Sequence, residues 1–336
     1  MRAFEIQNKF GLDSLTQVER PDPTAAPYHA VIKLRAASLN YRDLLTIEGK
    51  YNPRLPLPLV PLSDGVGEVV AVGDGVTRVK MGDRVAANFS QKWLGGEPAR
   101  AKLGASLGGP LDGMLTQYRA LNEEGLVHVP DHLTDEEAAT LPCAAVTAWN
   151  SLINMGELSA GETVLVQGTG GVSIFALQFA KISGARVIVT SSSDEKLERA
   201  KKLGADFGVN YTTTPDWDKR AKEITGGIGV DHIIEVGGAG TFGKSLRAIK
   251  IGGHIGMIGN LAGNATEVNL VLILMQNLRI QGVMVGSRDT FESMNRAIAL
   301  HEMRPVIDRV FAFDEARQAF EHMKSGSHFG KICIKF

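Results

Sequence analysis

Short and nearly unbroken apolar runs alternate with stretches of helical pattern from about residue 160 onward. The apolar runs predict strands at 163–167, 186–190, 207–211, 230–236, 254–258 and 278–285. Helical patterns lie between them at 172–183, 194–203, 216–225 and 243–249. Strands that are apolar on both faces are typical of a parallel sheet with helices on each side. We therefore expect an α/β fold class, with a Rossmann-type doubly wound parallel sheet in this half.

The first 120 residues show a different pattern. Strand-like segments at 30–36, 65–72 and 84–87 are interrupted by Gly and Pro, which is typical of a small, mainly β domain. The last fifty residues predict two helices and a closing strand, at 290–301, 314–323 and 331–335. Because a six-stranded sheet has no place for these elements, we assign them to the β domain. The expected domains are residues 1–122 together with 287–336, and residues 123–286.

Composition disfavours several classes of function. The 336 residues include 36 basic and 37 acidic side chains, a formal net charge of −1, and no dense Lys/Arg stripe, so we expect no nucleic-acid partner. The longest apolar run, 270–275, is far shorter than the ~20 residues that span a bilayer, so we expect no membrane helix and no signal peptide. Cys143 and Cys333 cannot form a disulfide framework or a cysteine-rich zinc site, which fits a reducing, cytoplasmic setting.

A glycine-rich turn follows the first of the apolar runs. It reads Gly-Thr-Gly-Gly-Val-Ser from residue 168, and the helical pattern begins within it. An ordinary turn can contain such glycines, but a strand before and a helix after favour a dinucleotide-binding loop. The pyrophosphate would then lie at the helix N-terminus, with Ser173 small enough to replace a third glycine. The residues expected to contact a cofactor here are Gly168, Thr169, Gly170, Gly171 and Val172.

The end of the second apolar run bears on the choice of cofactor. NAD sites usually place Asp or Glu there to bind the ribose 2′-hydroxyl. This chain has three consecutive serines from Ser191, followed by Lys196, and these groups favour the 2′-phosphate of NADP(H). An alternative function for the serines is helix capping, with Ser192 and Glu195 forming a capping box. Capping and phosphate binding are compatible, so Ser191, Ser192 and Lys196 remain candidate cofactor residues.

Motifs spread in order along the whole chain carry a resemblance to a known family. They are Ser-Leu-Asn-Tyr-Arg-Asp at 38–43, Gly-Val-Gly-Glu-Val at 65–69, Gly-Asp-Arg-Val at 82–85, Leu-Gly-Ala-Asp at 203–206 and Gly-Lys at 330–331. With the glycine loop, they resemble the medium-chain dehydrogenase/reductase (alcohol dehydrogenase-like) superfamily and, within it, the zinc-free quinone oxidoreductase-like branch. The resemblance implies a mainly β, GroES-like catalytic domain beside an NADP-binding Rossmann domain.

Departures from the zinc-dependent members argue against a metal. Those members carry a Cys near the position of Asn40 and a His-Glu pair where this chain has Ser63-Asp64. Asn and Ser bind Zn²⁺ poorly. The cysteine-rich lobe of such members would lie around residues 88–110, where this chain has no Cys, and Pro130 separates His128 from His132. We expect no metal site.

The resemblance and the order of the motifs imply further cofactor contacts. Thr147 matches a threonine that contacts the cofactor in the family. Gly259 and Asn260 follow the fifth strand of the Rossmann half and would border the nicotinamide ribose. Tyr211 would close over the adenosine, or is a half-buried strand aromatic. Phe329 and Lys331 are expected to close the cofactor cleft.

Hydride transfer without a metal leaves negative charge that hydrogen-bond donors or a proton source must meet. A conjugated substrate spreads that charge, and a weak acid completes its reduction. The candidate catalytic residues are Asn40, Tyr41 and Tyr51, where Tyr51 matches a cleft tyrosine of related reductases or is simply an aromatic in a surface loop.

The long loop 88–112, with Trp93, is either a lid over bulky planar substrates or a flexible surface excursion.

The sequence therefore predicts an NADPH-dependent, zinc-free oxidoreductase that reduces a quinone, enone or enoyl substrate. The expected partner is a small, planar or conjugated carbonyl compound. Two alternatives remain: a zinc-free alcohol or aldehyde dehydrogenase, and a non-catalytic NADPH-binding protein. The last predicted strand, 278–285, would lie at a sheet edge, where pairing with a second copy predicts a homodimer.

Overall fold

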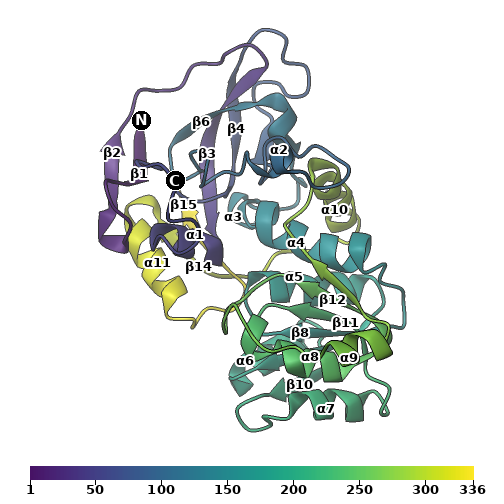
Figure 1. The fold of residues 1–336 in the computed structure, drawn as a ribbon. Helices are drawn as coiled ribbons and strands as arrows, with labels where there is room; N and C mark the ends of the chain where they lie inside the picture. Colours follow the sequence, from purple (N-terminus) through teal and green to yellow (C-terminus); the bar gives the residue numbers. More distant parts are fainter. The chain divides into compact units, whose positions relative to one another are not determined.

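The computed structural model describes residues 1–336, and the chain divides into two compact units. Unit 1 comprises Met1–Val146 and Gly286–Phe336, and unit 2 comprises Thr147–Val285 (Figure 1). None of the helices combines the length and the apolar character that a membrane crossing requires.

Unit 2 contains a six-stranded sheet in which all neighbouring strands are parallel. The strand order is β10-β9-β8-β11-β12-β13, which is the order of a Rossmann fold, so the predicted fold class is confirmed. The strands are β8 (Thr163–Gln167), β9 (Arg186–Ser191), β10 (Phe207–Asn210), β11 (Val230–Glu235), β12 (Ile249–Met257) and β13 (Arg279–Gly282). The helices are α5 (Gly171–Ile182), α6 (Asp194–Lys202), α7 (Trp217–Ile224), α8 (Phe242–Ala248) and α9 (Leu270–Met275).

Apolar side chains of the sheet and helices form the core of unit 2. Trp217 of α7 and Phe242 of α8 pack in one buried cluster with Leu165, Ile188 and Ile233 from three strands. Ahead of the sheet, α4 (Val146–Trp149) and a π-helical segment (Asn150–Met155) lead into β8, and Trp149 packs edge-on against Phe179 of α5. The glycine loop is thus held between a buried strand and a buried helix.

Unit 1 is built on a seven-stranded sheet with the order β14-β15-β3-β4-β5-β7, in which β6 also pairs with β3. Its strands are β3 (His29–Leu39), β4 (Asp64–Val72), β5 (Arg84–Ala87), β6 (Tyr118–Asn122), β7 (Leu126–His128), β14 (Ile307–Ala312) and β15 (Lys331–Lys335), with a hairpin of β1 (Arg2–Ile6) and β2 (Leu15–Glu19). Its helices are α1 (Tyr41–Ile47), α2 (Arg100–Leu103), α3 (Asp135–Ala139), α10 (Arg288–Leu300) and α11 (Ala316–Lys324). The last fifty residues belong to this unit, as the sequence predicts.

The boundary between the units differs from the predicted one. Residues 123–146, which the sequence analysis assigned to the Rossmann domain, belong to unit 1. The physical reason is strand pairing: Val85–Ala87 of β5 pair with Leu126–His128 of β7, and α3 packs on β3 and β4. The other boundary, at Gly286, is one residue before the predicted position of 287.

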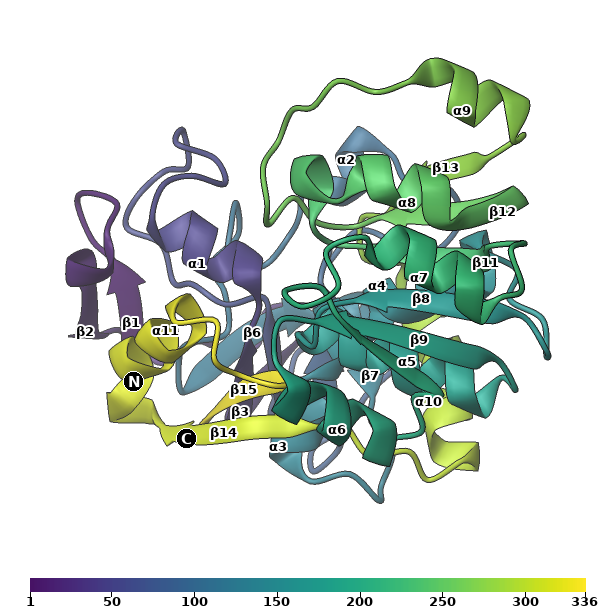
Figure 2. The ribbon, with the colours of Figure 1, turned by 90° about the horizontal axis from the view of Figure 1, so that it is seen from below.

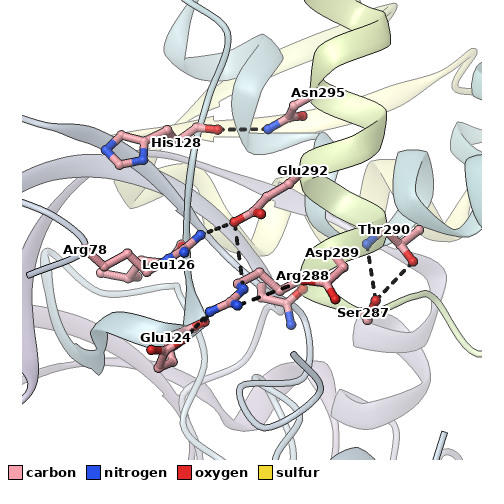
Figure 3. Close-up of polar contacts among 12 residues, drawn as sticks. Arg78, Glu124, Leu126, His128, Ser287, Arg288, Asp289, Thr290, Glu292 and Asn295 are labelled. Atoms are coloured by element: carbon pink, nitrogen blue, oxygen red, sulfur yellow. Dashed lines mark hydrogen bonds and ion pairs between the residues drawn. The ribbon is translucent and has the colours of Figure 1, made fainter. Parts of the chain in front are cut away.

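Side chains cover the outer edge of β7 in unit 1 (Figure 3). Asn295 of α10 donates to the carbonyl of His128 at 2.9 Å, and Arg78 Nε donates to the carbonyl of Leu126 at 3.1 Å. Arg78 and Arg288 also form ion pairs with Glu292. Because an open strand edge invites pairing with another chain, these contacts protect this end of the sheet.

Candidate functional site

The glycine loop of unit 2 has the geometry of a ligand-binding turn. Gly168 has φ +69°, a left-handed conformation that favours glycine, and its N–H donates to the carbonyl of Thr190 at 2.8 Å. A Cβ added at Gly168 or at Gly170, the N-cap of α5, would meet no protein atom within 4 Å. Packing therefore does not require a glycine at 170, and the open space in front of the loop lets a ligand approach the N-terminus of α5, which fits a pyrophosphate.

Ser173 has the packing role that the sequence predicts. It is 2% exposed, and its hydroxyl donates to the carbonyl of Gln167 at 2.7 Å. This bond attaches the first turn of α5 to the end of β8, so a small residue is needed there. Thr169, between the two open glycines, is also buried.

The carboxyl ends of β9 and β10 bring the other nucleotide candidates together. Ser191 is the last residue of β9 and is buried, while Ser192 and Tyr211 are exposed. The N–H of Tyr211 donates to the carbonyl of Ser191 at 3.0 Å. The side chain of Asp194, at the start of α6, accepts a hydrogen bond from Asn210 at 2.8 Å. Because the last residue of β9 is Ser191, the strand does not end in an Asp or Glu.

The predicted capping box of Ser192 and Glu195 is wrong. The N-cap of α6 is Ser193, whose hydroxyl accepts from the N–H of Lys196 at 3.3 Å. Ser191 Oγ in turn accepts from the N–H of Ser193 at 3.2 Å, so the turn starts one residue later than predicted. Ser192 is thus left out of the cap and is exposed.

A buried carboxylate that the sequence analysis missed organises the neighbouring turn. Glu235, the last residue of β11, is 0% exposed. Oε1 accepts from the N–H groups of Gly237 and Gly238, both at 3.0 Å, and Oε2 accepts from Gln167 Nε2 at 2.7 Å. A Glu that follows Ile233 and Ile234 directly and precedes Val-Gly-Gly is the signal that could have revealed it.

The turn after β12 packs against the turn after β11. A Cβ added at Gly259 would lie 2.6 Å from the carbonyl oxygen of Val236, so this close approach requires glycine. Asn260 is exposed, and its side chain bonds to Asn264 at 2.5 Å. Gly259 and Asn260 thus lie just beyond the carboxyl end of β12, and β11 lies between this strand and β8, which carries the glycine loop.

Unit 1 contains a compact cluster of buried polar groups at the start of α1. Asn40 is the N-cap of this helix and is 8% exposed, and its N–H donates to Asp43 Oδ2 at 2.8 Å. Asn40 Nδ2 donates to Ser63 Oγ at 3.3 Å, and Ser63 Oγ donates to Asp64 Oδ1 at 2.7 Å. Lys331 Nζ donates to Asn40 Oδ1 at 2.6 Å and lies 3.8 Å from Asp64 Oδ2. We call these five residues the Asn40 cluster.

Burial controls the ionisation of the carboxyls in the Asn40 cluster. Desolvation raises the pKa of Asp43 to about 6, although the nearby Arg42 guanidinium acts to lower it. Desolvation also raises the pKa of Asp64, while the Lys331 ammonium opposes the shift. The thiol of Cys143, whose N–H donates to Asp64 Oδ2 at 3.3 Å, has a pKa raised far above its usual value by burial. The raised pKa keeps this half-buried thiol protonated at neutral pH, which disfavours a role as a nucleophile.

Tyr51 is fixed although it is nearly half exposed. The Arg42 guanidinium lies 4.9 Å from the centre of its ring and 5.0 Å from that of Phe89. Arg42 also donates to the carbonyls of Leu107 and Gly109, at 3.0 and 3.2 Å. Arg42 thus joins Tyr51 to the loop 88–112 through a cation–π contact and hydrogen bonds.

The other predicted residues of unit 1 have different surroundings. Tyr41, the first residue of α1, is exposed, whereas Phe329 is 1% exposed and lies in the core. Trp93 is buried, and its indole N–H donates to the carbonyl of Gly96 at 2.8 Å, so it packs within its own loop. Thr147, at the start of unit 2, is also buried.

The Asn40 cluster does not fit a zinc ion. No group of three or more His, Cys, Asp or Glu side chains in the structure could hold a metal. The Asn40 carbonyl oxygen already accepts from the Lys331 ammonium, which would repel a second cation at this place. The donor set is that of a hydrogen-bonding site.

Comparisons with known proteins agree with this architecture. The family described as "Alcohol dehydrogenase GroES-like domain" matches residues 26–131, and the family described as "Zinc-binding dehydrogenase" matches residues 171–300. A zinc-type alcohol dehydrogenase-like protein of Schizosaccharomyces pombe is 46% identical over 332 residues, covering 97% of this chain and 96% of that protein. An acryloyl-coenzyme A reductase of Metallosphaera sedula is 31% identical, covering 94% of this chain and 95% of that protein.

Solved structures are similar along the full chain. A putative alcohol dehydrogenase from Sinorhizobium meliloti has a TM-score of 0.92 at 42% identity, covering 100% of this chain and 99% of that one. A structure described as an NAD-dependent alcohol dehydrogenase has a TM-score of 0.92 at 33% identity, covering all of both chains.

Proposed function

Because the chain belongs to the medium-chain dehydrogenase/reductase superfamily of nicotinamide-dependent oxidoreductases, we propose that it is a zinc-free NADPH-dependent reductase of conjugated carbonyl compounds. The substrate class comprises quinones, enones and enoyl thioesters. The acryloyl-coenzyme A reductase among its relatives supports an enoyl thioester within this class.

The Asn40 cluster is the observation that carries the proposal. Its described side chains offer an amide, a hydroxyl and an ammonium in place of metal ligands. Amide and hydroxyl donors stabilise the delocalised negative charge of a conjugated substrate better than the localised charge of a simple alkoxide. The donor set therefore favours reduction of an activated double bond.

The glycine loop and the neighbouring strand ends would hold the cofactor. Gly168, Thr169, Gly170, Gly171 and Val172 would surround its pyrophosphate at the N-terminus of α5. Ser191, Ser192 and Lys196 would bind the 2′-phosphate, and the lack of a carboxylate at the end of β9 favours NADP(H) over NAD(H). Thr147, Tyr211, Gly259 and Asn260 complete the set in unit 2. When bound, the reduced cofactor supplies the hydride.

The chain's own side chains would supply the donor and the proton. Asn40 would orient the substrate carbonyl through Nδ2, and the phenol of Tyr51 would donate a proton to the enolate carbon. The Arg42 guanidinium lies against the Tyr51 ring, so the ring has a packing partner although the side chain is nearly half exposed. Tyr41 is the second candidate donor because it follows Asn40 directly and is exposed.

A substrate panel tests the proposal. Chelator-treated protein is mixed with NADPH and a quinone, an enone, an enoyl thioester and a simple aldehyde, and cofactor oxidation is followed by absorbance. We expect turnover of at least one conjugated substrate, no loss on chelation, and a tenfold or greater preference for NADPH over NADH. Turnover of the aldehyde alone would replace the proposal with a second function, a zinc-free alcohol or aldehyde dehydrogenase. The words "alcohol dehydrogenase" in the names of the S. pombe and S. meliloti proteins support alcohol or aldehyde chemistry, and the S. pombe name also says zinc-type. Tight NADPH binding without any turnover would identify a non-catalytic binding protein.

A homodimer is part of the proposed assembly. Strand β13 lies at the edge of the sheet in unit 2, and α9 precedes it in the chain (Figure 2). The α9 side chains Leu270, Val271, Leu274 and Met275 are each more than half exposed. An open strand edge beside an exposed apolar helix fits antiparallel pairing with a second copy. Light scattering on Leu274→Glu against wild type should show a shift from dimer to monomer, and a monomeric wild type would contradict the assembly.

A further inference from the structure

Lys331 is a buried cation that the sequence analysis assigned to the cofactor. It begins β15, which pairs antiparallel with β3 so that Ile332 lies opposite Leu39. Gly330 precedes it with φ +83°, and a Cβ there would lie 2.4 Å from the carbonyl oxygen of Val306. The chain thus passes through a narrow space that only glycine allows, and it brings the Lys331 side chain, 3% exposed, beside Asn40.

The contacts of the ammonium determine the orientation of the Asn40 amide. Lys331 Nζ donates to the carbonyl of Leu39 and to Asn40 Oδ1, both at 2.6 Å. An ammonium group has donors and no acceptor, so the Asn40 atom facing it must be the carbonyl oxygen. The Nδ2 group must then face the opposite way, where it reaches Ser63 Oγ at 3.3 Å.

The Asn40 backbone is fixed as well as its side chain. Its N–H donates to Asp43 Oδ2, so the residue is held at both its main chain and its amide. The bond from Nδ2 to Ser63 is long for an N–H···O bond, and this donor can exchange it for a stronger acceptor. The bond from Lys331 also polarises the amide and strengthens Nδ2 as a donor.

Burying an ammonium is costly, and an apolar side chain of similar length would avoid the desolvation penalty. The nearby carboxyls of Asp43 and Asp64 recover part of that cost, and Lys331 acts to lower the pKa of both. Charge balance alone, however, does not require contact with the Asn40 oxygen. The direct 2.6 Å bond to the amide is what a positioning role requires.

We propose that Lys331 is a positioning residue of the reduction, whose ammonium fixes the Asn40 carboxamide so that Nδ2 is presented to the carbonyl oxygen of the substrate. This inference rests on the proposed function, and it replaces the expected contact of Lys331 with the cofactor. The Lys331 ammonium then acts through the Asn40 amide to stabilise the negative charge that develops on the substrate carbonyl oxygen.

Steady-state kinetics on the full-length protein test the proposal with Lys331→Met, Lys331→Arg and a matched control. The control is Lys335→Met on the same strand, since the Lys335 side chain is 67% exposed and pairs with Glu136. We expect Lys331→Met to lower kcat about 100-fold, with KM and the Kd of NADPH changed less than threefold, and Lys331→Arg to recover part of kcat. The control should match wild type. A tenfold or greater rise in the Kd of NADPH with kcat retained would overturn the proposal, because it would make Lys331 a cofactor ligand.

A double-mutant cycle with Asn40→Ala tests whether Lys331 acts through the amide. If it does, adding Lys331→Met to Asn40→Ala lowers kcat less than threefold further, whereas independent roles would multiply the two losses. The acid limb of the kcat pH profile should also move to higher pH in Lys331→Met, since the cation no longer lowers the pKa of Asp43 and Asp64.

Crystal structures of the wild type and Lys331→Met give a result that does not depend on turnover. We expect the Asn40 amide to rotate or to occupy two orientations in the variant, and an amide unchanged in position would overturn the inference. If no conjugated carbonyl is turned over by the wild type, the proposed function fails while this comparison still decides the positioning. If Lys331→Met does not fold, Lys331→Arg takes its place in the cycle, because it keeps the charge and changes the contact with Asn40.

Discussion

The glycine loop of unit 2 and the Asn40 cluster of unit 1 are both polar, yet they are built in opposite ways. The glycine loop presents main-chain groups and open space, and a Cβ at Gly168 or Gly170 would meet nothing within 4 Å. The Asn40 cluster is closed, with Ser63, Asp64 and Lys331 each at most 3% exposed and bonded to one another or to Asn40. The loop is therefore open to a ligand, whereas the side chains of the cluster satisfy one another and leave Asn40, at 8% exposed, as its most exposed member.

The first prediction concerns the open space of the loop and has the largest expected effect. Gly170→Val should lower NADPH affinity 100-fold or more and leave the melting temperature within about 2 °C of wild type. The reason is that Gly170 has an ordinary φ of −77° and no neighbour that a side chain would strike, so only a ligand is displaced. Fluorescence titration with NADPH and thermal melts measure both quantities.

Gly243→Ala is the matched control for Gly170→Val. Gly243 lies within α8, and a Cβ there would meet only the end of the Arg247 side chain, at 3.9 Å. This variant should bind NADPH as the wild type does. If Gly170→Val binds NADPH normally, the loop is not the pyrophosphate site.

A second prediction concerns the stability of unit 2 and its buried hydrogen-bond network around Glu235. Glu235→Gln places an amide where a buried carboxylate accepts from Gly237, Gly238 and Gln167. We expect a loss of about 3 kcal/mol in the free energy of unfolding, because donors would then face donors. Urea denaturation measures it, with the exposed Glu198→Gln as control. A loss below about 1 kcal/mol would show that the network is dispensable.

A third prediction uses the titration of Asp43. Its pKa is raised from 3.8 to about 6 in the folded chain, so the folded state binds the proton more tightly than the unfolded state. The stability that this group contributes is therefore complete below about pH 4 and is lost as the pH rises through about 6. Between pH 4 and 7, wild type should lose about 2 kcal/mol relative to Asp43→Asn. Urea titrations at each pH measure this difference, and parallel curves would contradict the raised pKa.

The smallest effect is expected at Lys196, in the helix α6 that follows β9. Lys196→Met should weaken NADPH binding about tenfold and leave NADH binding unchanged, because only the 2′-phosphate would lose a cation. Lys202→Met, at the other end of α6, is the matched control. Isothermal titration with both cofactors gives the comparison. Equal effects on NADPH and NADH would remove Lys196 from the phosphate site.

The two regions also differ in how far the sequence predicts them. The glycine loop and all six strands of unit 2 were predicted because each rests on contiguous residues: β8 has the predicted bounds, and β9 ends one residue later. In unit 1, the hairpin of β1 and β2 and the short strands β6, β7 and β14 were not predicted, because their burial comes from distant partners. The assignment of residues 123–146 failed for the same reason, since β7 finds its place only by pairing with β5.

The Asn40 cluster shows this limit at the level of single residues. Asn40 was a candidate from its motif, but its partner Lys331 is 291 positions away in the chain. Only the register of β15 against β3 brings the two together. The motif near the end of the chain therefore identified Lys331 as a candidate residue, but it could not predict the contact with Asn40.

The position of the transferred hydrogen in the product distinguishes reduction of the carbon–carbon double bond from reduction of the carbonyl. Chelator-treated protein is supplied with NADPH deuterated at the reactive C4 position and with an enone, and the product is examined by mass spectrometry and NMR. We expect a saturated ketone with deuterium on the carbon β to the carbonyl, and a rate that falls at least tenfold in Tyr51→Phe. An allylic alcohol with deuterium on the carbonyl carbon, or activity that disappears with the metal, would contradict it.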